Sequence, residues 1–250
     1  MKARIKFRKY GALKFIGHLD VMRYFQKVMR RADIPIAFTG GFSPHMIMSF
    51  ASPLGIGLES DGEYLDIELT EPIAGREAVR RMNAVSADGI EVLSFRQIAE
   101  EKKMTGMTIL AAADYLISPR QSMKSDCIHV HNLLPGDWKE RFSAFMDQDE
   151  IRVVKQTKRS EREVNLRPLI FQWSFRGDSI FVRSAAGSAE NLKPDLIVDA
   201  FLKYMGDSIS CTELPDAGLF IYRRLEMYAD TGKDGKRNLV TLESLGGEIH

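Results

Sequence analysis

The hydrophobic pattern of residues 2–95 switches between two periods, and this switching constrains the fold more than any other feature of the chain. Apolar residues at every second position are typical of half-buried strands, and apolar residues at every third or fourth position are typical of amphipathic helices. We predict strands at 2–8, 34–39, 46–50, 63–69 and 89–95, and helices at 19–33 and 75–85. The strands at 34–39 and 46–50 form one hairpin. When this hairpin is counted as a single strand, the order is strand, helix, strand, strand, helix, strand, as in a ferredoxin-like unit.

The same order recurs in the second part of the chain. We predict strands at 114–118, 150–155, 163–170, 171–175, 180–184 and 219–228, and helices at 137–147 and 194–205. The sequence therefore predicts an α+β protein of two ferredoxin-like (βαββαβ) halves packed together, at residues 1–98 and 108–228. Residues 229–250 contain four glycines and are expected to form a flexible tail or a terminal hairpin.

The first predicted strand carries a row of cations. Its apolar residues are expected to face the core, while the cations Lys2, Arg4, Lys6 and Arg8 line the other face as a basic stripe. Arg23, Arg30 and Arg31 follow on the first helix, where cations in the last turn also suit the helix dipole. A solvated strand face is the alternative explanation for the stripe.

Charge is distributed unevenly along the chain. Residues 1–31 contain ten Lys and Arg and one acidic residue, whereas the other residues contain 25 Lys and Arg and 33 Asp and Glu. A cationic segment on a nearly neutral chain indicates a localised anionic partner, for which RNA is the leading candidate. We expect Asp66 and Glu68 to lie on a solvated strand face.

Two glycine-containing segments follow the first helix. The loop Gly40, Gly41, Phe42, Ser43 and Pro44 is followed by His45, and a second loop spans 53–60. Glycine permits a positive φ or the close approach of a ligand to the backbone. The spacing matches neither the dinucleotide fingerprint nor the P-loop, and well-formed turns are the simpler explanation.

These segments carry a resemblance to a known family. Lys9-Tyr10-Gly11, Phe15 to Asp20, Gly41 to His45 and Pro53 to Ser60 together resemble the radical-SAM-linked protein family, which has a DUF2344-type domain of uncharacterised function. Residues 158–170 resemble its second landmark, with Asn165 where the family pattern has aspartate and Gly17 where it has serine. The resemblance implies association with a radical SAM protein. It implies no known reaction.

His18 and His45 are the histidines of this motif region. If they converge, they could act as an acid–base pair on a ribose hydroxyl, and together with Asp20 they could hold a metal. Contact with an anion and a structural hydrogen-bonding role are the other possibilities. Arg167 lies in a predicted strand between Leu166 and Pro168, where a cation is expected to have a partner.

The cysteine content limits the chemistry of the chain. Cys127 and Cys211 are far apart and form no CxxC motif, so the chain alone cannot supply the ligands of an iron–sulfur cluster. We expect no metal or cofactor here, with S-adenosylmethionine and the cluster in the partner only. We also expect a cytoplasmic location with reduced thiols and no membrane segment.

Three functions remain open from the sequence. The favoured one is an accessory RNA-binding or adaptor module, working with a radical SAM enzyme and having no chemistry of its own, with ribosomal or transfer RNA as its ligand. The second is an RNA-processing or RNA-modifying enzyme that uses His18 and His45. The third is a pure protein-interaction subunit, for which an exposed apolar patch would speak.

Overall fold

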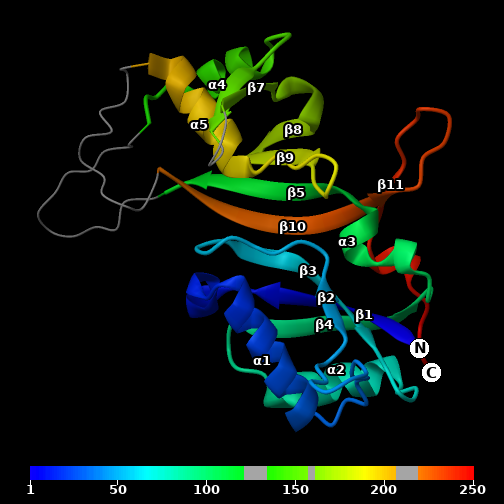
Figure 1. Ribbon diagram of the computed structural model, residues 1–250. Coiled ribbons are helices and arrows are strands. Elements are labelled where there is room, and N and C mark those ends of the chain that lie inside the picture. Colours follow the sequence, from blue (N-terminus) through cyan, green and yellow to red (C-terminus); the bar gives the residue numbers. More distant parts are fainter. Residues whose placement is uncertain (121–133, 157–160, 207–218) are drawn as a thin grey trace, which may run out of the picture. The chain divides into compact units, whose positions relative to one another are not determined.

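The computed structural model describes residues 1–120, 134–156, 161–206 and 219–250 (Figure 1). Strands predominate over helices, and most strand pairs are antiparallel, so the α+β class predicted from the sequence is confirmed. The chain divides into two compact units, each built from separate segments. The first contains 1–114, 186–189 and 223–250, and the second contains 115–185 and 190–222.

The first unit contains the basic strand. Its elements are β1 (Lys2–Lys9), α1 (His18–Arg31), β2 (Met48–Phe50), β3 (Glu59–Glu68), α2 (Gly75–Val85), β4 (Ile90–Ile98), α3 (Gly106–Ile109) and β11 (Leu239–Thr241). Short 3₁₀ helices lie at Gly11–Phe15, Lys102–Met104 and Glu243–Leu245. β1 pairs with β3 and β4, and β2 pairs with β3, all in antiparallel orientation, which gives the order β4-β1-β3-β2.

The helices α1 and α2 cover one face of this sheet. Ile5 and Phe7 are fully buried there, as the alternation predicts, and they pack in one core with Phe25 of α1 and Met82 of α2. The ring of Phe7 meets that of Phe25 edge-on, with 4.6 Å between centroids. The period-2 strand and the period-3.6 helix therefore bury their apolar faces against each other.

The opposite face of the same sheet is covered as well. The guanidinium of Arg4 on β1 donates hydrogen bonds to the carbonyls of Met104 and Leu242, at 3.1 and 3.0 Å. These carbonyls belong to the segment before α3 and the segment after β11. The prediction of a solvent-facing stripe is therefore wrong for Arg4. Its side chain is only 2% exposed, because segments distant in sequence lie over it.

Two strands pass from one unit into the other. β5 (Leu110–Pro119) begins in the first unit, and β10 (Phe220–Asp230) ends there. β10 pairs in parallel with the start of β3 and in antiparallel with β11. The C-terminal segment also joins the first unit, because Gln97 and Gly247 exchange backbone hydrogen bonds of 2.9 and 2.8 Å.

The second unit has its own core. Its elements are α4 (Trp138–Met146), β6 (Arg152–Gln156), β7 (Glu161–Asn165), β8 (Ile170–Arg176), β9 (Ser179–Ala185) and α5 (Pro194–Met205). β8 pairs with β9, while β6 and β7 form a separate two-stranded sheet. Phe142 of α4 and Phe201 of α5 are fully buried and meet edge-on at 5.0 Å.

Some predicted boundaries are wrong, for identifiable reasons. The hairpin segment at 34–39 makes isolated bridges, Ile36 to Leu69 and Phe38 to Met46, in place of a continuous strand, and Pro35 within it can donate no ladder hydrogen bond. The predicted strand 163–170 is interrupted by a 3₁₀ turn at Arg167–Leu169, where Pro168 can donate no ladder hydrogen bond. Among the described residues, no helix is long and apolar enough to span a membrane.

Candidate functional site

The four cations of the predicted basic stripe each have a hydrogen-bond partner within the chain. Lys2 donates from Nζ to the carbonyl of Glu100 at 2.6 Å. Arg4 forms a two-point pair with Asp66 of β3, with Nε to Oδ1 at 2.7 Å and a terminal nitrogen to Oδ2 at 2.9 Å. The expectation that Asp66 lies on a solvated face is therefore wrong, since Asp66 is 6% exposed. It accepts a third bond, from the backbone N–H of Gly106 at 2.7 Å.

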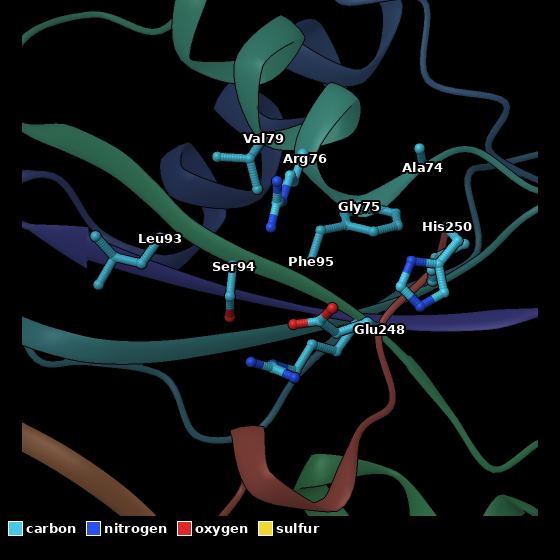
Figure 2. Close-up of a pocket in the computed structure, with 11 residues that line it drawn as sticks. Ala74, Gly75, Arg76, Val79, Leu93, Ser94, Phe95, Glu248 and His250 are labelled. Atoms are coloured by element: carbon cyan, nitrogen blue, oxygen red, sulfur yellow. The ribbon is translucent and has the colours of Figure 1, made fainter.

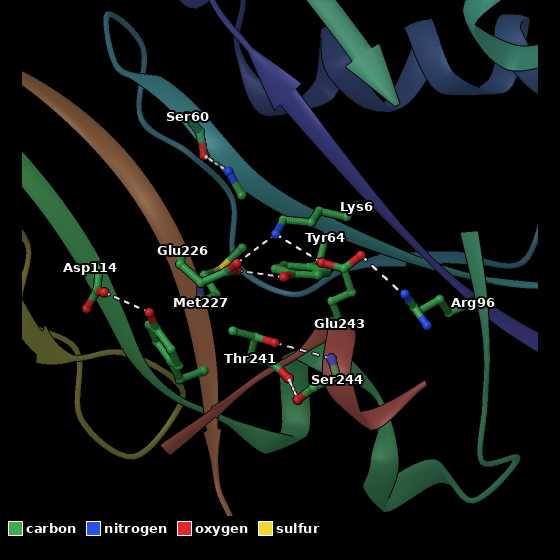
Figure 3. Close-up of polar contacts among 12 residues, drawn as sticks. Lys6, Ser60, Tyr64, Arg96, Asp114, Glu226, Met227, Thr241, Glu243 and Ser244 are labelled. Atoms are coloured by element: carbon green, nitrogen blue, oxygen red, sulfur yellow. Dashed lines mark hydrogen bonds and ion pairs between the residues drawn. The ribbon is translucent and has the colours of Figure 1, made fainter. Parts of the chain in front are cut away.

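Lys6 is the centre of a larger polar cluster (Figure 3). Its Nζ lies 2.7 Å from Glu226 of β10 and 3.1 Å from Glu243 in the C-terminal segment, and Tyr64 donates its hydroxyl to Glu226 at 2.6 Å. Burial works to lower the pKa of Lys6, but the hydrogen bonds and charges of the two glutamates outweigh it and raise the pKa above 10.5. Lys6 therefore keeps its positive charge, and the two glutamates compensate it.

Arg8 continues the same pattern at the end of the strand. It bonds Asp61 at 3.0 Å and Glu91 at 3.2 Å, and Asp61 also pairs with Arg223 of β10 at 2.6 Å. The acids that neutralise the stripe come from β3, β4, β10 and the C-terminal segment. Sequence reasoning missed them because no local pattern links them to β1, and two of them, Glu226 and Glu243, lie 220 and 237 residues from Lys6.

Exposed cations without acidic partners lie instead on α1. Lys27, Arg30 and Arg31 are exposed, and within the part of the chain that the structure describes they have no ion-pair partner. Arg23 lies one turn earlier and approaches Asp20 at 3.5 Å, with its side chain 68% exposed. Since α1 turns its apolar face to the core, these cations lie on its outward side. They form what we call the cationic surface of α1, made of Arg23, Lys27, Arg30 and Arg31.

His18 and His45 are not brought together. The ring of His18 meets that of Phe50 edge-on at 5.1 Å, whereas His45 lies in the glycine loop and contacts the Thr39 hydroxyl through Nδ1 at 3.1 Å. His45 and Phe50 lie five positions apart along largely extended chain, which corresponds to about 16 Å. Each histidine thus has a local contact, and the two do not form one site.

The glycine loop is closed at its base and open at its tip. Thr39 donates its backbone N–H to His45 at 2.9 Å, and His45 donates its own to the Thr39 hydroxyl at 3.1 Å. Gly40, Gly41, Phe42, Ser43 and Pro44 are all exposed, and Gly41 has a φ of 99°, which favours glycine. Phe42 projects fully into solvent.

Arg167 belongs to the second unit. Its backbone N–H donates to the Asn165 side-chain oxygen at 3.1 Å, and that oxygen also accepts from Ile151 at 3.0 Å. Asn165 therefore organises the turn after β7. The guanidinium of Arg167 reaches the carbonyl of Ile170 at 3.5 Å, so the partner expected for this cation is a weak backbone contact.

A cavity of about 510 Å³ lies where α2 begins, beside the edge of β4 (Figure 2). Its apolar part contains Val79, Leu93 and Phe95, and its polar part includes Arg76 and the residues Glu248 and His250. The backbone N–H of Gly75 donates to Ile249 at 2.8 Å. The sequence could not indicate this cavity, because the C-terminal residues carry no periodic pattern.

Metal ligands do not cluster in the described parts of the chain: no group of three or more His, Cys, Asp or Glu is arranged to hold an ion there. Cys127 and Cys211 lie outside the described residues.

The fold and its surfaces define an α+β protein. Acids of the chain compensate the charges of Arg4, Lys6 and Arg8 in its sheet, and the helix α1 exposes cations to solvent. The family model for DUF2344, an uncharacterised protein conserved in bacteria, matches residues 2–194, and the chain belongs to this family. The sequence matches none of the curated proteins. Among solved structures, a chain of a Cbf5-Nop10-Gar1 complex is similar with a TM-score of 0.43 and 11% identity, covering 90% of this chain and 48% of that chain.

Proposed function

We propose that this protein is an accessory RNA-binding or adaptor module that works with a radical SAM enzyme and has no chemistry of its own. The observation that carries the proposal is the cationic surface of α1. Lys27, Arg30 and Arg31 are exposed and lack acidic partners among the described residues, so their charge is available to phosphates. Arg4, Lys6 and Arg8 of β1, by contrast, are engaged with acids of the chain.

The proposal extends to architecture and setting. We take both halves as ferredoxin-like units, supported by the strand orders β4-β1-β3-β2 and β10-β5-β9-β8. S-adenosylmethionine and the iron–sulfur cluster would belong to the partner, and the module would be cytoplasmic. Ribosomal and transfer RNA are the expected ligands.

Binding of purified RNA at several salt concentrations tests the proposal. Each phosphate contact contributes about 0.7 to 0.9 to the slope of log affinity against log salt. The variant Lys27→Gln/Arg30→Gln should flatten the slope by about 1 to 2 units. Lys233→Gln/Lys236→Gln removes the same charge from exposed positions in the loop between β10 and β11 and should leave the slope unchanged. If the wild-type protein has no salt-dependent affinity for ribosomal or transfer RNA, the proposal fails.

An RNA-processing or RNA-modifying activity is the alternative. It would need His18 and His45 to act at separate positions, because each has its own local contact. Incubation of labelled RNA with the wild-type protein and with His45→Ala distinguishes the two functions. Loss of cleavage or modification in His45→Ala, with RNA affinity retained, would favour the enzyme.

A pure protein-interaction subunit is the third function. Three exposed apolar side chains near the start of α1, from Phe15, Leu19 and Ile56, favour this protein-binding function.

A further inference from the structure

The outward side of α1 presents its cations in a line. α1 lies with α2 on one side of the sheet (Figure 1), and Arg23, Lys27 and Arg30 each follow by two positions a residue that packs into the core, as Lys27 follows Phe25. Two positions turn a helix by about 200°, so these cations point away from the sheet. Along the helix axis, Arg23 and Lys27 are about 6 Å apart and Lys27 and Arg30 about 4.5 Å apart.

Acidic residues bound this line at both ends. Asp20 in the first turn pairs with Arg23 at 3.5 Å, and Asp33 is exposed two residues after Arg31, where α1 ends. Between these acids, the other three cations of the surface have no ion-pair partner among the described residues. The cationic surface of α1 is therefore short, with charge available for about two or three phosphates.

Neither helix exposes groups that read bases. On α1, Tyr24 is half-buried and its hydroxyl accepts a hydrogen bond of 2.8 Å from the backbone N–H of Ala87, while Gln26 is half-buried. α2 contains no aromatic residue, and the Asn83 amide exchanges two hydrogen bonds of 2.8 Å with the backbone of Val92. Unpaired bases are typically bound by stacking on exposed rings and by hydrogen bonds to their edges. This surface offers contacts to phosphates instead.

The exposed ring that precedes α1 belongs to Phe15. The Lys14 ammonium lies over this ring, 5.4 Å from its centroid, and also pairs with Glu59 at 3.4 Å. A base could stack only on the opposite face of the ring, which makes Phe15 a control position for stacking.

A surface that contacts phosphates alone favours the polymer with the higher charge density. A duplex carries about one charge per 1.7 Å of its axis, with half of the charges on each strand. A single strand must also be ordered on the fixed cations, and here no base stacking offsets that cost. The duplex form of RNA holds its phosphates in regular rows beside a wide, shallow minor groove, which a helix can approach from outside.

We propose that the cationic surface of α1 binds base-paired RNA, the stem of a folded RNA, through its phosphates and without reading the base sequence. The inference rests on the proposed RNA-binding function and names the class of RNA that this site takes. Single-stranded RNA is the alternative that the experiments must separate from it.

The salt dependence gives the expected size of the preference. Three phosphate contacts give slopes of about 2.7 for a duplex and about 2.1 for a single strand. If the two affinities meet at about 1 M salt, this difference amounts to about fourfold at about 0.1 M. Ordering of the single strand adds to the preference for the duplex.

Fluorescence anisotropy with labelled RNA gives the first test. The probes are a duplex of about 20 base pairs, longer than the roughly 16 that duplex-binding domains span, and each of its strands alone, chosen without self-complementarity. The duplex should bind at least about fourfold more tightly at about 0.1 M salt. Duplexes of three unrelated sequences should bind within about twofold of one another, because sequence-specific contacts to bases are absent.

Substitutions locate the preference on the protein. Lys27→Gln/Arg30→Gln should reduce the ratio of duplex to single-strand affinity below about twofold, because about one phosphate contact remains. Lys233→Gln/Lys236→Gln should retain the wild-type ratio. Phe15→Leu and Phe42→Leu remove exposed rings and keep apolar side chains, and they should leave the affinity for the single strand unchanged. Far-ultraviolet circular dichroism of each variant should match the wild type, because the changed side chains are exposed.

The inference and the proposed function fail in different ways. Equal or tighter binding of the single strands, a strong dependence on duplex sequence, or weaker single-strand binding by Phe15→Leu would overturn the preference for base-paired RNA. In each of these cases the protein still binds RNA, and the proposed function stands. Absence of salt-dependent affinity for both duplex and single strand would overturn the proposed function and the inference together.

Discussion

Arg4 and Asp66 form a two-point ion pair between neighbouring strands, with side chains that are only 2% and 7% exposed. Arg4 Nε lies 2.7 Å from Asp66 Oδ1, and the backbone N–H of Gly106 donates to Asp66 Oδ2 at 2.7 Å. The pair thus ties β1 and β3 to the start of α3. A cation placed this way contributes to the fold and has no contact with solvent phosphates.

Asp66→Asn should destabilise the protein strongly, because it leaves the Arg4 charge buried without a counter-charge. Breaking one partner of a buried pair typically costs about 3 to 5 kcal/mol. Urea unfolding followed by circular dichroism measures the change. Glu77→Gln is the control, since Glu77 pairs with Arg80 and Arg81 at the surface, where solvent screens the charges, and its loss should cost much less. Equal costs for the two variants would contradict the structural role of Arg4.

Lys6→Gln/Arg8→Gln should lower stability and leave the RNA salt slope unchanged. Both cations are bound to acids of the chain, Lys6 to Glu226 and Glu243, and Arg8 to Asp61 and Glu91. Their removal leaves those carboxylates without partners. Urea unfolding and filter binding on the same samples check both outcomes. A flatter salt slope in Lys6→Gln/Arg8→Gln, with stability unchanged, would indicate that RNA contacts β1.

Stability at acid pH should depend on Glu243. Burial works to raise the pKa of Glu243, but hydrogen bonds from Ser94 and Lys6 outweigh it and hold the pKa below 4.5. A folded-state pKa below the unfolded value contributes stability that is present above about pH 4.5 and is lost as pH falls through the lower value. Glu243→Gln should therefore show a flatter loss of unfolding free energy below about pH 5.

A second carboxylate of the C-terminal segment provides the control for that measurement. Glu248→Gln changes an exposed residue and should retain the acid dependence of the wild type. Lys6 behaves in the opposite sense: its raised pKa contributes stability that is present below pH 10.5 and is lost above it. The unfolding free energy of Lys6→Gln should accordingly fall less steeply above about pH 10.5 than that of the wild type.

Gly62→Ala should weaken the packing of β3 against β10. A Cβ atom at Gly62 would lie 2.8 Å from the carbonyl of Leu225 and 3.0 Å from Glu226 Cα, so the backbone would have to move. Overpacking of this kind typically costs about 1 to 3 kcal/mol. Gly40→Ala introduces the same methyl group where nothing lies within 4 Å, and its melting temperature should stay close to that of the wild type.

Purified protein should contain no stoichiometric iron. The two cysteines, Cys127 and Cys211, are too few to ligate a cluster within one chain. Anaerobic purification followed by metal and sulfide analysis checks this prediction. Near-stoichiometric iron and sulfide would contradict the proposed adaptor function, which places the cluster in a partner protein.

Local pattern alone determined most elements of this protein. The period-2 alternation identified β1 and its buried residues Ile5 and Phe7, and the period-3.6 pattern with its flanking residues identified α2 at Gly75–Val85 and α5 at Pro194–Met205. Such patterns are local because a half-buried element must repeat apolar residues at its own period. The family resemblance likewise depended on short contiguous motifs.

Tertiary structure decided which cations are available for binding. Lys6 and Lys27 look equivalent in the sequence, yet Lys6 meets Glu226 and Glu243, while Lys27 is exposed without an ion-pair partner among the described residues. Charge pairing depends on distances in space, and the acids that pair with Lys6 lie 220 and 237 residues away in the chain. The separation of His18 from His45 was also decided by the course of the chain between them, because residue type alone sets no distance.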